Sequence, residues 1–346
     1  MVLTEQQEKA IDLACNSVAA GRPLFRIGGY AGTGKTTLAK NLFSKLPGGG
    51  CCAFCGKACD VLRKKGLPSQ TIHSMIYDWD AKTDRFWLKP NLPYNWIHLD
   101  EGSMVGTALW SDLQSYGIPI VVTGDPGQLE PVDDDDPHLM RDPDYVLDTI
   151  HRQAFNNPIV RLATEIRGGD DVNWRNFERR KSQIYDDALW ADVIIVGYNK
   201  SRIELNKHVR KLKGFNSTLQ TGERIVCKQN DKKLGIFNGM FFTVLETHRS
   251  GVCTLLTDDG KTYVLNVTDT GFHQFKRLPF DQTRKYAGVA MLADFGYAVT
   301  CHAFQGSEAE KVAYVDEHSD LWDLWRHRYT GATRAVSEFR IYKDKE

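Results

Sequence analysis

The stretch that decides the fold is Gly29-Tyr30-Ala31-Gly32-Thr33-Gly34-Lys35-Thr36, which completes the pattern G-x-x-x-x-G-K-[ST]. It follows an apolar run and precedes a helix-like stretch, which is the context that the pattern requires. Glycines let the backbone curl so that its N–H groups point at phosphate oxygens, and the helix N-terminus adds positive potential. Lys35 is expected to reach the β- and γ-phosphates, and the Thr36 hydroxyl to bind Mg²⁺. The expected phosphate-binding residues are Gly29, Gly32, Thr33, Gly34, Lys35, Thr36 and Thr37.

Short apolar runs bounded by Gly, Asp or Asn alternate with helix-like stretches around this loop. Such alternation favours a doubly wound α/β domain with parallel strands. The expected strands of the first domain are Leu24–Ile27, Cys51–Cys55, Trp96–Leu99 and Ile118–Thr123, and its expected helices are Glu5–Val18, Thr36–Ser44 and Ala58–Lys65. A second set predicts another α/β domain in series, with strands Asp192–Gly197, Tyr297–Thr300, Val312–Val315 and Phe339–Tyr342 and a helix over Ser201–Lys211.

Two stretches interrupt the alternation. Asp78 to Pro93 is polar and aromatic, and we expect a small hairpin inserted in the first domain. From about Gly222 to Ala293 the residues alternate as in β-strands, with turn signals such as Asn238-Gly239, which predicts a small inserted β-barrel. The predicted boundaries are 1–140 for the first domain, with 78–93 inserted, 141–221 and 294–346 for the second domain, and 222–293 for the barrel.

Composition sets the class of protein. A chain of 346 residues and 39.2 kDa can hold two domains with sizeable cores. Its 42% hydrophobic and 25% charged residues exclude a disordered or collagen-like chain. No apolar run approaches the roughly 20 residues that span a bilayer, and the polar, acidic start does not resemble a secretion signal. We therefore expect a soluble, cytoplasmic protein with no membrane partner. Basic and acidic residues balance at 44 each, so a nucleic-acid partner requires a local track of contacts.

Four of the eight cysteines lie close together in the sequence, at Cys51, Cys52, Cys55 and Cys59. A metal site is the functional interpretation of this cluster. However, Cys52 and Cys55 lie in an apolar run that predicts a buried strand, and no second Cys-x-x-Cys or His-x-His pair completes the set. Eight cysteines in a chain of this size do not indicate a disulfide scaffold. The sequence favours ordinary buried thiols in a reducing compartment over zinc ligands.

Carboxylates and an amide follow two of the predicted strands. A carboxylate at the end of a buried strand can hold Mg²⁺ through water, and its neighbour can orient and deprotonate the attacking water. We assign these roles to Asp100 and Glu101. The next strand leads into Gly124-Asp125-Pro126-Gly127-Gln128, in which Gln128 is a candidate for contact with the γ-phosphate. A purely structural role in the turn is the alternative for Gln128.

The expected nucleotide is ATP. A GTP-binding protein normally carries an Asn-Lys-x-Asp base reader, and the nearest string, Asn199-Lys200-Ser201-Arg202, lacks the Asp. Gln7, upstream of the loop, offers an amide that can pair with the N6/N7 edge of adenine.

The motifs occur along the chain in the order of a known family. They are Gly-Thr-Gly-Lys-Thr-Thr (32–37), Thr71-Ile72-His73, Asp100-Glu101-Gly102-Ser103-Met104, Gly124-Asp125-Pro126-Gly127-Gln128-Leu129, Arg152-Gln153, Thr300-Cys301-His302-Ala303-Phe304-Gln305-Gly306-Ser307-Glu308 and Thr333-Arg334-Ala335. This ordered set resembles the superfamily 1 helicases, and more narrowly the RecD/Dda-like branch, which moves 5′ to 3′ on single-stranded DNA. The matches run from residue 3 to residue 335.

The resemblance implies two RecA-like domains in tandem, with ATP in the cleft between them, a hairpin inserted in the first domain and an SH3-like barrel inserted in the second. It implies that Arg152 and Arg334 of the second domain reach the γ-phosphate, where an arginine finger is worth about 10³–10⁵ in rate. By the same resemblance, Gly306 and Glu308 lie near the ribose and phosphates. Hydrolysis would then depend on cleft closure, which would drive movement along DNA.

A DNA-contacting set follows from the same resemblance: Lys57, Thr71, His73, Thr300 and His302. Such contacts position a strand without reading its sequence. The chain departs from the family pattern Ala-Pro-Thr-Gly-Lys-Ala-Ala at Cys55, which stands where a Thr hydroxyl would bond a phosphate. A thiol is a poor donor, so contact there is expected to rest on backbone N–H groups and Lys57.

Strand separation requires a wedge, and in this branch the insertion of the first domain forms a pin. The matching segment is 78–93, and we expect Phe86 or Trp87 to be the stacking tip, with Trp79 packed beneath. Base–aromatic stacking of roughly 1–3 kcal/mol per base is comparable with a base-pair step. The alternative, that these aromatics only hold the hairpin together, stays open.

The function expected from these residues is ATP-driven, 5′-to-3′ DNA unwinding, with Mg²⁺ as the metal. The expected partners are single-stranded DNA and junctions of single- and double-stranded DNA, together with replication or recombination proteins, and the expected oligomeric state is a monomer. One alternative is a translocase on DNA or RNA that remodels nucleoprotein without efficient unwinding. Another is a nucleotide-gated nucleic-acid-binding protein without productive hydrolysis, which Glu101, Gln128, Arg152 and Arg334 argue against.

Overall fold

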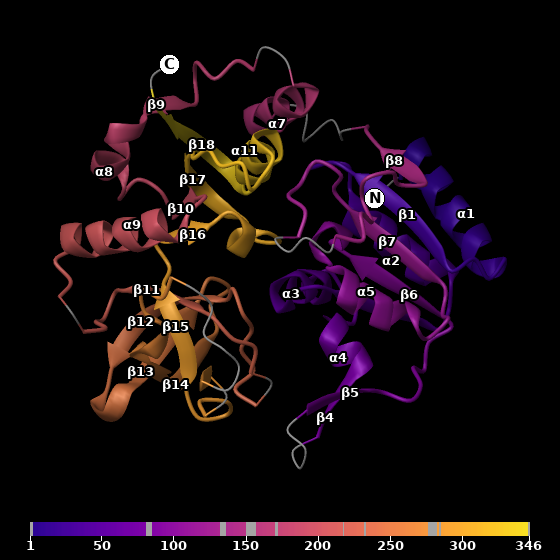
Figure 1. Cartoon of the computed structure of the whole chain (residues 1–346), viewed down its shortest axis with the longest axis horizontal. Helices are drawn as coiled ribbons and strands as arrows, with labels where there is room; N and C mark the ends of the chain where they lie inside the picture. Colours follow the sequence, from indigo (N-terminus) through magenta and orange to yellow (C-terminus); the bar gives the residue numbers. More distant parts are fainter. Residues whose placement is uncertain are drawn as a thin grey trace. The chain divides into compact units, whose positions relative to one another are not determined.

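The structure is a computed structural model that describes residues 3–80, 85–131, 136–149, 157–169, 172–216, 218–231, 233–275, 282–283 and 285–344. The chain divides into two compact units, Met1–Arg167 and Gly168–Glu346 (Figure 1). This boundary lies later than the predicted 140/141, because β8 (Tyr145–Leu147) pairs with β1 (Leu24–Gly29) and so belongs to the first sheet.

The first unit contains a six-stranded parallel sheet in the order β3-β2-β6-β7-β1-β8. Its further strands are β2 (Gly49–Ala53), β3 (Ser69–Thr71), β6 (Trp96–Asp100) and β7 (Ile120–Gly124), and its helices are α1 (Glu5–Ala19), α2 (Lys35–Lys45), α3 (Gly56–Lys64), α4 (Ile72–Ile76), α5 (Thr107–Gln114) and α7 (Pro158–Gly168), the last ending at the unit boundary. All four predicted strands are present, with ends shifted by one or two residues. The doubly wound α/β prediction for this part of the chain is confirmed.

Alternating side chains of the central strands serve two apolar layers. One layer, around Trp96 and Val121, packs under α1 and α2. The other layer, around Leu99 and Val122, packs under α4 and α5. Because successive strand residues point to opposite faces, Asp100 shares the α2 face with Trp96. The phosphate-binding loop between β1 and α2 and the end of β6 both lie at the carboxyl ends of strands in one parallel sheet.

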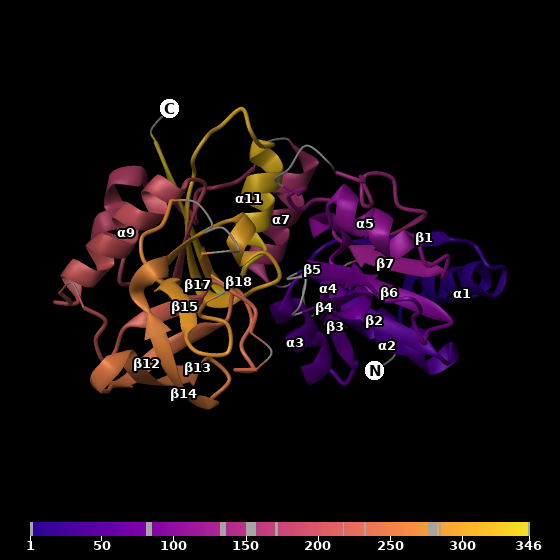
Figure 2. The same cartoon turned by 60° about the horizontal axis from the view of Figure 1, so that its bottom comes forward.

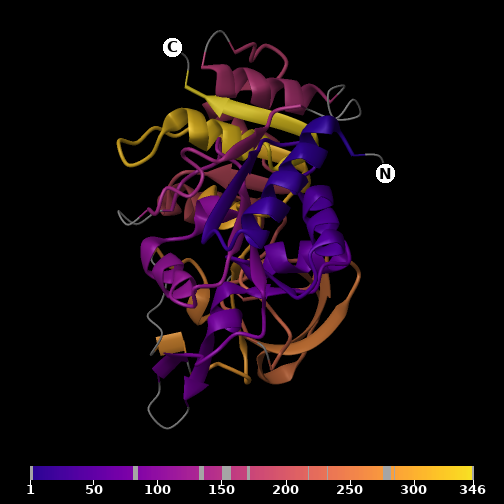
Figure 3. The ribbon, with the colours of Figure 1, turned by 90° about the vertical axis from the view of Figure 1, so that its right-hand side faces the viewer.

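A hairpin projects from the α4 end of the first unit (Figures 1 and 3). It consists of β4 (Tyr77–Asp80) and β5 (Arg85–Leu88), which pair antiparallel; residues 81–84 lie outside the described part of the chain. Its base is fixed to the body of the unit, because Tyr77 Oη donates to Asp112, and Tyr116 Oη bonds the carbonyls of Ile76 (3.0 Å) and Lys89 (2.8 Å).

The second unit contains a parallel sheet in the order β16-β10-β17-β18-β9. Its strands are β9 (Glu178–Arg180), β10 (Val193–Val196), β16 (Ala298–Thr300), β17 (Ala309–Val315) and β18 (Ala335–Lys343), and its helices are α8 (Ile184–Asp187), α9 (Asn199–Leu212) and α11 (Leu324–Ala332). The helices α9 and α11 lie on opposite sides of this sheet (Figure 2). Accordingly, Ala313 of β17 packs in the core shared with α9, whereas its neighbour Tyr314 contacts His327 of α11.

A closed five-stranded barrel is inserted in the second unit. Its strands are β11 (Arg224–Cys227), β12 (Phe241–Thr247), β13 (Val252–Thr257), β14 (Thr262–Thr268) and β15 (Met291–Phe295). The barrel interior and the α9 face of the sheet form one continuous apolar cluster, which includes Phe242 and Leu255 from the barrel and Val196 from β10. The barrel and the sheet of this unit are therefore joined through a common core.

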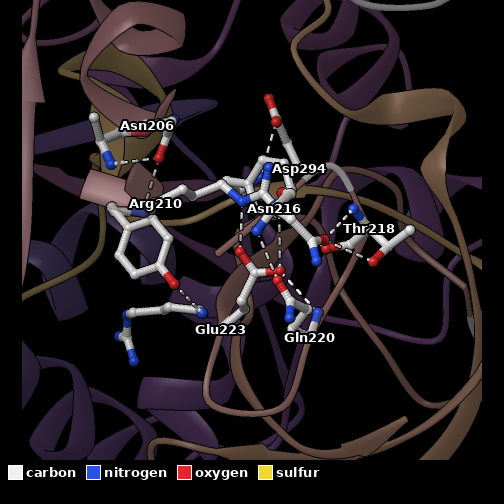
Figure 4. Close-up of polar contacts among 11 residues, drawn as sticks. Asn206, Arg210, Asn216, Thr218, Gln220, Glu223 and Asp294 are labelled. Carbon is white, nitrogen blue, oxygen red and sulfur yellow. Dashed lines mark hydrogen bonds and ion pairs between the residues drawn. The ribbon is translucent and has the colours of Figure 1, made fainter. Parts of the chain in front are cut away.

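Polar side chains of α9 reinforce that connection (Figure 4). Arg210 donates to Glu223 Oε1 at 2.5 Å and lies over the Phe295 ring of β15 at 4.0 Å. Asn206 bonds the backbone of Ala298 with both ends of its amide, and Arg202 forms an ion pair with Asp294 of β15. These residues are spaced four apart, so one face of α9 faces both the sheet and the barrel.

Among the described residues, no helix combines the length and the apolar character that a membrane span requires.

Candidate functional site

The loop between β1 and α2 has the geometry of a phosphate cradle. Gly32 and Gly34 have left-handed φ values of 80° and 79°, which favour glycine. A Cβ on Gly29 would lie 2.9 Å from both Lys35 Cγ and Thr33 Oγ1, so a side chain there would fill the cradle. Lys35 Nζ donates to the carbonyl of Gly29 at 2.6 Å. The ammonium is thus held beside the loop by neutral oxygens, for which phosphate oxygens can be exchanged.

Gln7 is fixed against the same loop. Its Oε1 accepts the N–H of Thr4 at 3.0 Å, and Thr4 Oγ1 accepts the N–H of Gln7 at 3.2 Å, so the two residues form the capping box of α1. Gln7 Nε2 donates to the carbonyl of Thr33 at 3.0 Å, and the residue is 1% exposed. The structure therefore gives Gln7 a bracing role for the loop, and reading adenine would require an exchange of these bonds.

The predicted acidic pair lies at the carboxyl end of β6. In the sheet, β7 separates β6 from β1, so the acids are two strands from the phosphate loop. Asp100 Oδ1 accepts a hydrogen bond from Thr123 Oγ1 of β7 at 2.7 Å. Glu101 has a positive φ of 54°, an unusual conformation for a side chain of its size. Such strained residues concentrate at functional sites, and here the turn directs the chain into the short helix Gly102–Met104.

The loop after β7 is ordered by a residue to which the sequence analysis gave no role. Asp125 is fully buried, and its Oδ1 accepts the N–H of Gly127 at 2.9 Å, while Gln128 N–H bonds the carbonyl of Asp125 at 3.2 Å. Gln128 is itself 3% exposed. The string Asp-Pro-Gly is a turn signal of the Asx type, which could have identified Asp125 as the loop organiser.

A cation missed by the sequence analysis lies next to the predicted metal ligand. Lys65 Nζ, at the end of α3, is 3.5 Å from Thr36 Oγ1. Thr37 contributes through its backbone, since its N–H bonds the carbonyl of Gly34 at 3.0 Å. No local sequence signal connects Lys65 with the loop, because the contact depends on the packing of α3 beside α2.

In the second unit, Arg334 lies beside the loop that contains Gly306 and Glu308. Arg334 is 6% exposed, and its guanidinium donates to the carbonyls of Thr330 and Ser307, both at 3.2 Å. Ala309 N–H in turn bonds the carbonyl of Arg334 at 3.0 Å. The structure thus brings Arg334, Gly306 and Glu308 together. Arg152 lies outside the described residues.

Three predicted DNA contacts lie at helix starts of the first unit. Thr71 caps α4, because its Oγ1 accepts the N–H of Ser74 at 3.2 Å, and His73 follows it as an exposed side chain. Cys55 Sγ accepts the N–H of Ala58 at 3.5 Å as the cap of α3, and the half-buried Lys57 lies in the first turn. Burial raises the pKa of Cys55, so the cap is a neutral thiol. A helix N-terminus next to Lys57 is a favourable position for a phosphate.

Thr300 and His302 lie together in the second unit, at the carboxyl end of β16 and in the short helix His302–Phe304. Thr300 lines a small pocket of about 60 Å³ with Lys228, Asn238 and Phe241 of the barrel region. Burial lowers the pKa of His302, so its imidazole is neutral at physiological pH. A neutral His302 can donate a hydrogen bond to a phosphate but adds no net charge.

The hairpin separates its aromatic side chains. Trp79 lies opposite Phe86, with ring centroids 4.8 Å apart, whereas Trp87 lies opposite Asp78 on the other face. Phe86 and Trp87 are 53% and 54% exposed, and Trp79 is 39% exposed. Trp79 therefore lies beside Phe86 rather than beneath it.

The clustered cysteines are placed individually. Cys51 Sγ contacts His98 Nδ1 at 3.5 Å, while Cys52 and Cys59 are buried in apolar clusters on opposite faces of the sheet. In the described part of the chain, one group of three side chains has potential metal-ligand atoms close to one another. It consists of Glu130, Asp136 and His138, and it contains none of these cysteines.

Comparison with known families and proteins places these residues in context. The model of the AAA_30 family, described as an AAA domain, matches residues 2–185, more than half of the chain. The ATP-dependent RecD2 DNA helicase of Deinococcus radiodurans is 28% identical over 379 residues, which cover 97% of this chain and 48% of that protein. The ATP-dependent DNA helicase Dda of enterobacteria phage T4 is 27% identical over 249 residues, covering 60% of this chain and 57% of that protein. The chain spans about half the length of these relatives.

Solved structures show the same fold. A crystal structure of Bacteroides Pif1 bound to single-stranded DNA aligns with a TM-score of 0.65 and 18% identity, covering 100% of this chain and 92% of that one. A crystal structure of Pif1 helicase from Candida albicans aligns with a TM-score of 0.62 and 16% identity, covering 100% and 95%. The expected α/β fold with RecA-like domains is confirmed, and so is the resemblance to the superfamily 1 RecD/Dda-like proteins.

Proposed function

The chain belongs to the AAA_30 family of AAA domains, and from this premise we propose that it is an ATP-dependent DNA helicase that moves 5′ to 3′ on single-stranded DNA. One observation carries the proposal: the Lys35 loop and the Asp100–Glu101 pair both follow the carboxyl ends of strands, β1 and β6, in one parallel sheet. Phosphoryl transfer requires such a combination of phosphate cradle, metal ligand and water-orienting carboxylate. The likeness to RecD2 and Dda, both named as ATP-dependent DNA helicases, supports DNA unwinding as the purpose of the hydrolysis.

Each side chain around the nucleotide has a separate task in this proposal. Lys35 exchanges its bond to the Gly29 carbonyl for phosphate oxygens. Thr36 and Asp100 hold Mg²⁺, which neutralises charge on the phosphoryl oxygens when bound. Glu101 orients the attacking water, and Gln128 contacts the γ-phosphate from its ordered loop. Gln7 links the adenine to the loop through Thr33.

The proposed arginine finger is Arg334. The three hydrogen bonds described for its guanidinium all end on neutral oxygens, those of Thr330, Ser307 and Thr333, so its charge remains available for a phosphate. Gly306 and Glu308, on the neighbouring loop, are proposed to lie near the ribose and phosphates. Arg152 is proposed as a second arginine at the γ-phosphate, on the basis of its motif alone.

Lys57, Thr71 and His73 of the first unit, and Thr300 and His302 of the second, are proposed to contact the DNA backbone. Both sets combine helix starts with short polar side chains, which suit phosphates better than bases. The hairpin of β4 and β5 is proposed as a strand-separating pin, with Phe86 or Trp87 as the stacking residue, because both rings are exposed. The five-stranded barrel is proposed to be SH3-like.

The test is an ATPase assay with and without single-stranded DNA, followed by unwinding of duplexes with a 5′ or a 3′ tail. We expect DNA to stimulate hydrolysis many-fold, and unwinding to require the 5′ tail. Lys35→Ala should abolish turnover, whereas Lys40→Ala, an exposed lysine of the same helix, should leave it unchanged. Arg334→Ala should bind ATP and hydrolyse it at least 10³-fold more slowly. Hydrolysis that ignores DNA, or unwinding from a 3′ tail alone, would contradict the proposal.

A further inference from the structure

Three buried side chains form a line of hydrogen bonds that ends on Asp100. Cys51 Sγ is 3.5 Å from His98 Nδ1, His98 Nε2 is 2.9 Å from Thr123 Oγ1, and Thr123 Oγ1 is 2.7 Å from Asp100 Oδ1. The line crosses three adjacent strands, β2, β6 and β7. His98 and Thr123 are completely buried, and Cys51 is 3% exposed. Residues 98 and 100 share the α2 face of the sheet because they are two apart on one strand.

The chemistry of these groups fixes the direction of each bond. An ionised carboxylate only accepts, so Thr123 must donate its one proton to Asp100. Thr123 can then only accept from His98, which therefore carries its proton on Nε2. In the neutral imidazole with its proton on Nε2, Nδ1 carries no proton and accepts from the Cys51 thiol. Burial raises the pKa of Cys51, which keeps that thiol protonated.

Resting on the proposed function, we propose that Thr123 and His98 are positioning residues that hold the Asp100 carboxylate in the orientation in which it binds Mg²⁺. Thr123 occupies Oδ1, which leaves Oδ2 as the oxygen for the metal or its water. His98 fixes the hydroxyl of Thr123, which would otherwise rotate freely about its C–O bond. Partners of this kind, behind a ligand, typically change metal affinity 10- to 100-fold when removed.

Packing alone does not account for this arrangement. Buried polar groups cost stability unless they are hydrogen-bonded, and an apolar residue would fill the interior of a parallel sheet at less cost. The neighbours Leu99 and Val122 follow that rule on the opposite face of the same strands. The polar line is therefore maintained by its one ionised end, Asp100. Thr123 also lies one residue before the end of β7, from which the loop of Gln128 begins, so the same bond links the metal ligand to that loop.

The experiment measures binding of the fluorescent analogue mant-ATP in Mg²⁺ and in EDTA. The readout is the dissociation constant in EDTA divided by the dissociation constant in Mg²⁺, which is the factor by which the metal tightens binding. Asp100→Asn should bring the ratio near one. Thr123→Val removes the hydroxyl at constant shape and should lower the ratio about ten-fold, whereas Thr123→Ser should retain it. His98→Gln keeps an N–H donor near the position of Nε2 and should retain the ratio, whereas the shorter His98→Asn should lose it.

Matched variants separate positioning from packing. Cys51→Ala should lower the ratio by a few-fold, whereas Cys52→Ala, an equal truncation on the same strand, should not change it. A wild-type ratio in Thr123→Val overturns the inference, and so does an equal loss in Thr123→Ser. If Thr123→Val fails to fold, the His98→Gln and His98→Asn pair decides. A wild-type protein that binds no mant-ATP in either buffer defeats the proposed function, and this inference with it.

Discussion

The stability of the protein should depend on pH through His327, a completely buried histidine of α11. Its Nδ1 accepts the hydroxyl of Tyr314 at 2.5 Å, and its ring stacks on Trp322 with centroids 4.9 Å apart. Burial, with a smaller effect of His302, lowers the pKa of His327 to about 4, against an opposing effect of Asp316. The unfolded chain has the ordinary pKa of about 6.5.

The sign and the magnitude follow from this difference in pKa. As the pH falls below about 6.5, the unfolded state binds a proton at His327 that the folded state does not bind, so acid favours unfolding. The free energy of unfolding should fall between about pH 6.5 and pH 4, where the folded state also begins to protonate. At 1.36 kcal/mol per pKa unit, a difference of about 2.5 units gives a loss of about 3 kcal/mol.

The assay is urea unfolding at a series of pH values for the wild type, His327→Asn and His327→Phe. Both replacements lack a titratable group, and Asn keeps an acceptor for Tyr314. Their stabilities at pH 8 should differ, because they pack differently. Between pH 6.5 and pH 4, however, the free energy of unfolding of both variants should fall by about 3 kcal/mol less than that of the wild type. The comparison of the three pH dependences removes the contributions of other titratable groups. Equal slopes in all three proteins would refute a buried, neutral His327.

Other predictions concern the metal site, the barrel and the hairpin. Lys65→Ala removes a cation beside the proposed metal position, so the Mg²⁺ concentration for half-maximal ATPase should fall roughly two- to five-fold; an unchanged titration would contradict this. Arg210→Met leaves Glu223 buried and uncompensated and should cost about 3–5 kcal/mol in urea unfolding, with partial recovery in Arg210→Met/Glu223→Gln. Phe86→Ala and Trp87→Ala change opposite faces of the hairpin, so we expect unwinding to fall several-fold in one of them while DNA-stimulated ATPase persists; normal unwinding in the double variant would exclude the pin.

The sequence predicted the central strands and the edge strand β16, and it missed the other three edge strands of the two parallel sheets. β3, β8 and β9 are three residues long and lie at the ends of their sheets. β9 has the sequence Glu178-Arg179-Arg180 and pairs with β18 alone. A central strand must be apolar because both of its faces are covered, and this need creates a pattern that can be read. An edge strand is held by hydrogen bonds to one neighbour, which any sequence can form, so a polar edge strand such as β9 gives no signal, whereas the apolar edge strand β16 was predicted.

The loop of the nucleotide site was predictable because one backbone shape demands glycine at fixed positions. The bracing contact of Gln7 was missed for the opposite reason, since a side-chain amide can serve several partners, and its pairing with adenine stays a prediction. The capping-box pattern Thr4-x-x-Gln7 was nevertheless readable, and it assigns the Gln7 amide to the start of α1. Contacts such as Lys65 with Thr36 join different helices, and spacing along the chain does not encode them.

The hydrogen-bonded line from Cys51 to Asp100 could be predicted from the sequence only in part. Alternation along β6 places His98 on the same face as Asp100, and this much follows from the sequence. Whether His98 meets a hydroxyl depends on which strand lies beside β6, and the chain order alone does not specify that β7 does. The motif that contains Asp100 and the one that begins after Thr123 are separate strings in the sequence. In the fold they are adjacent strand ends, so a residue that belongs to neither motif, His98, can act on both.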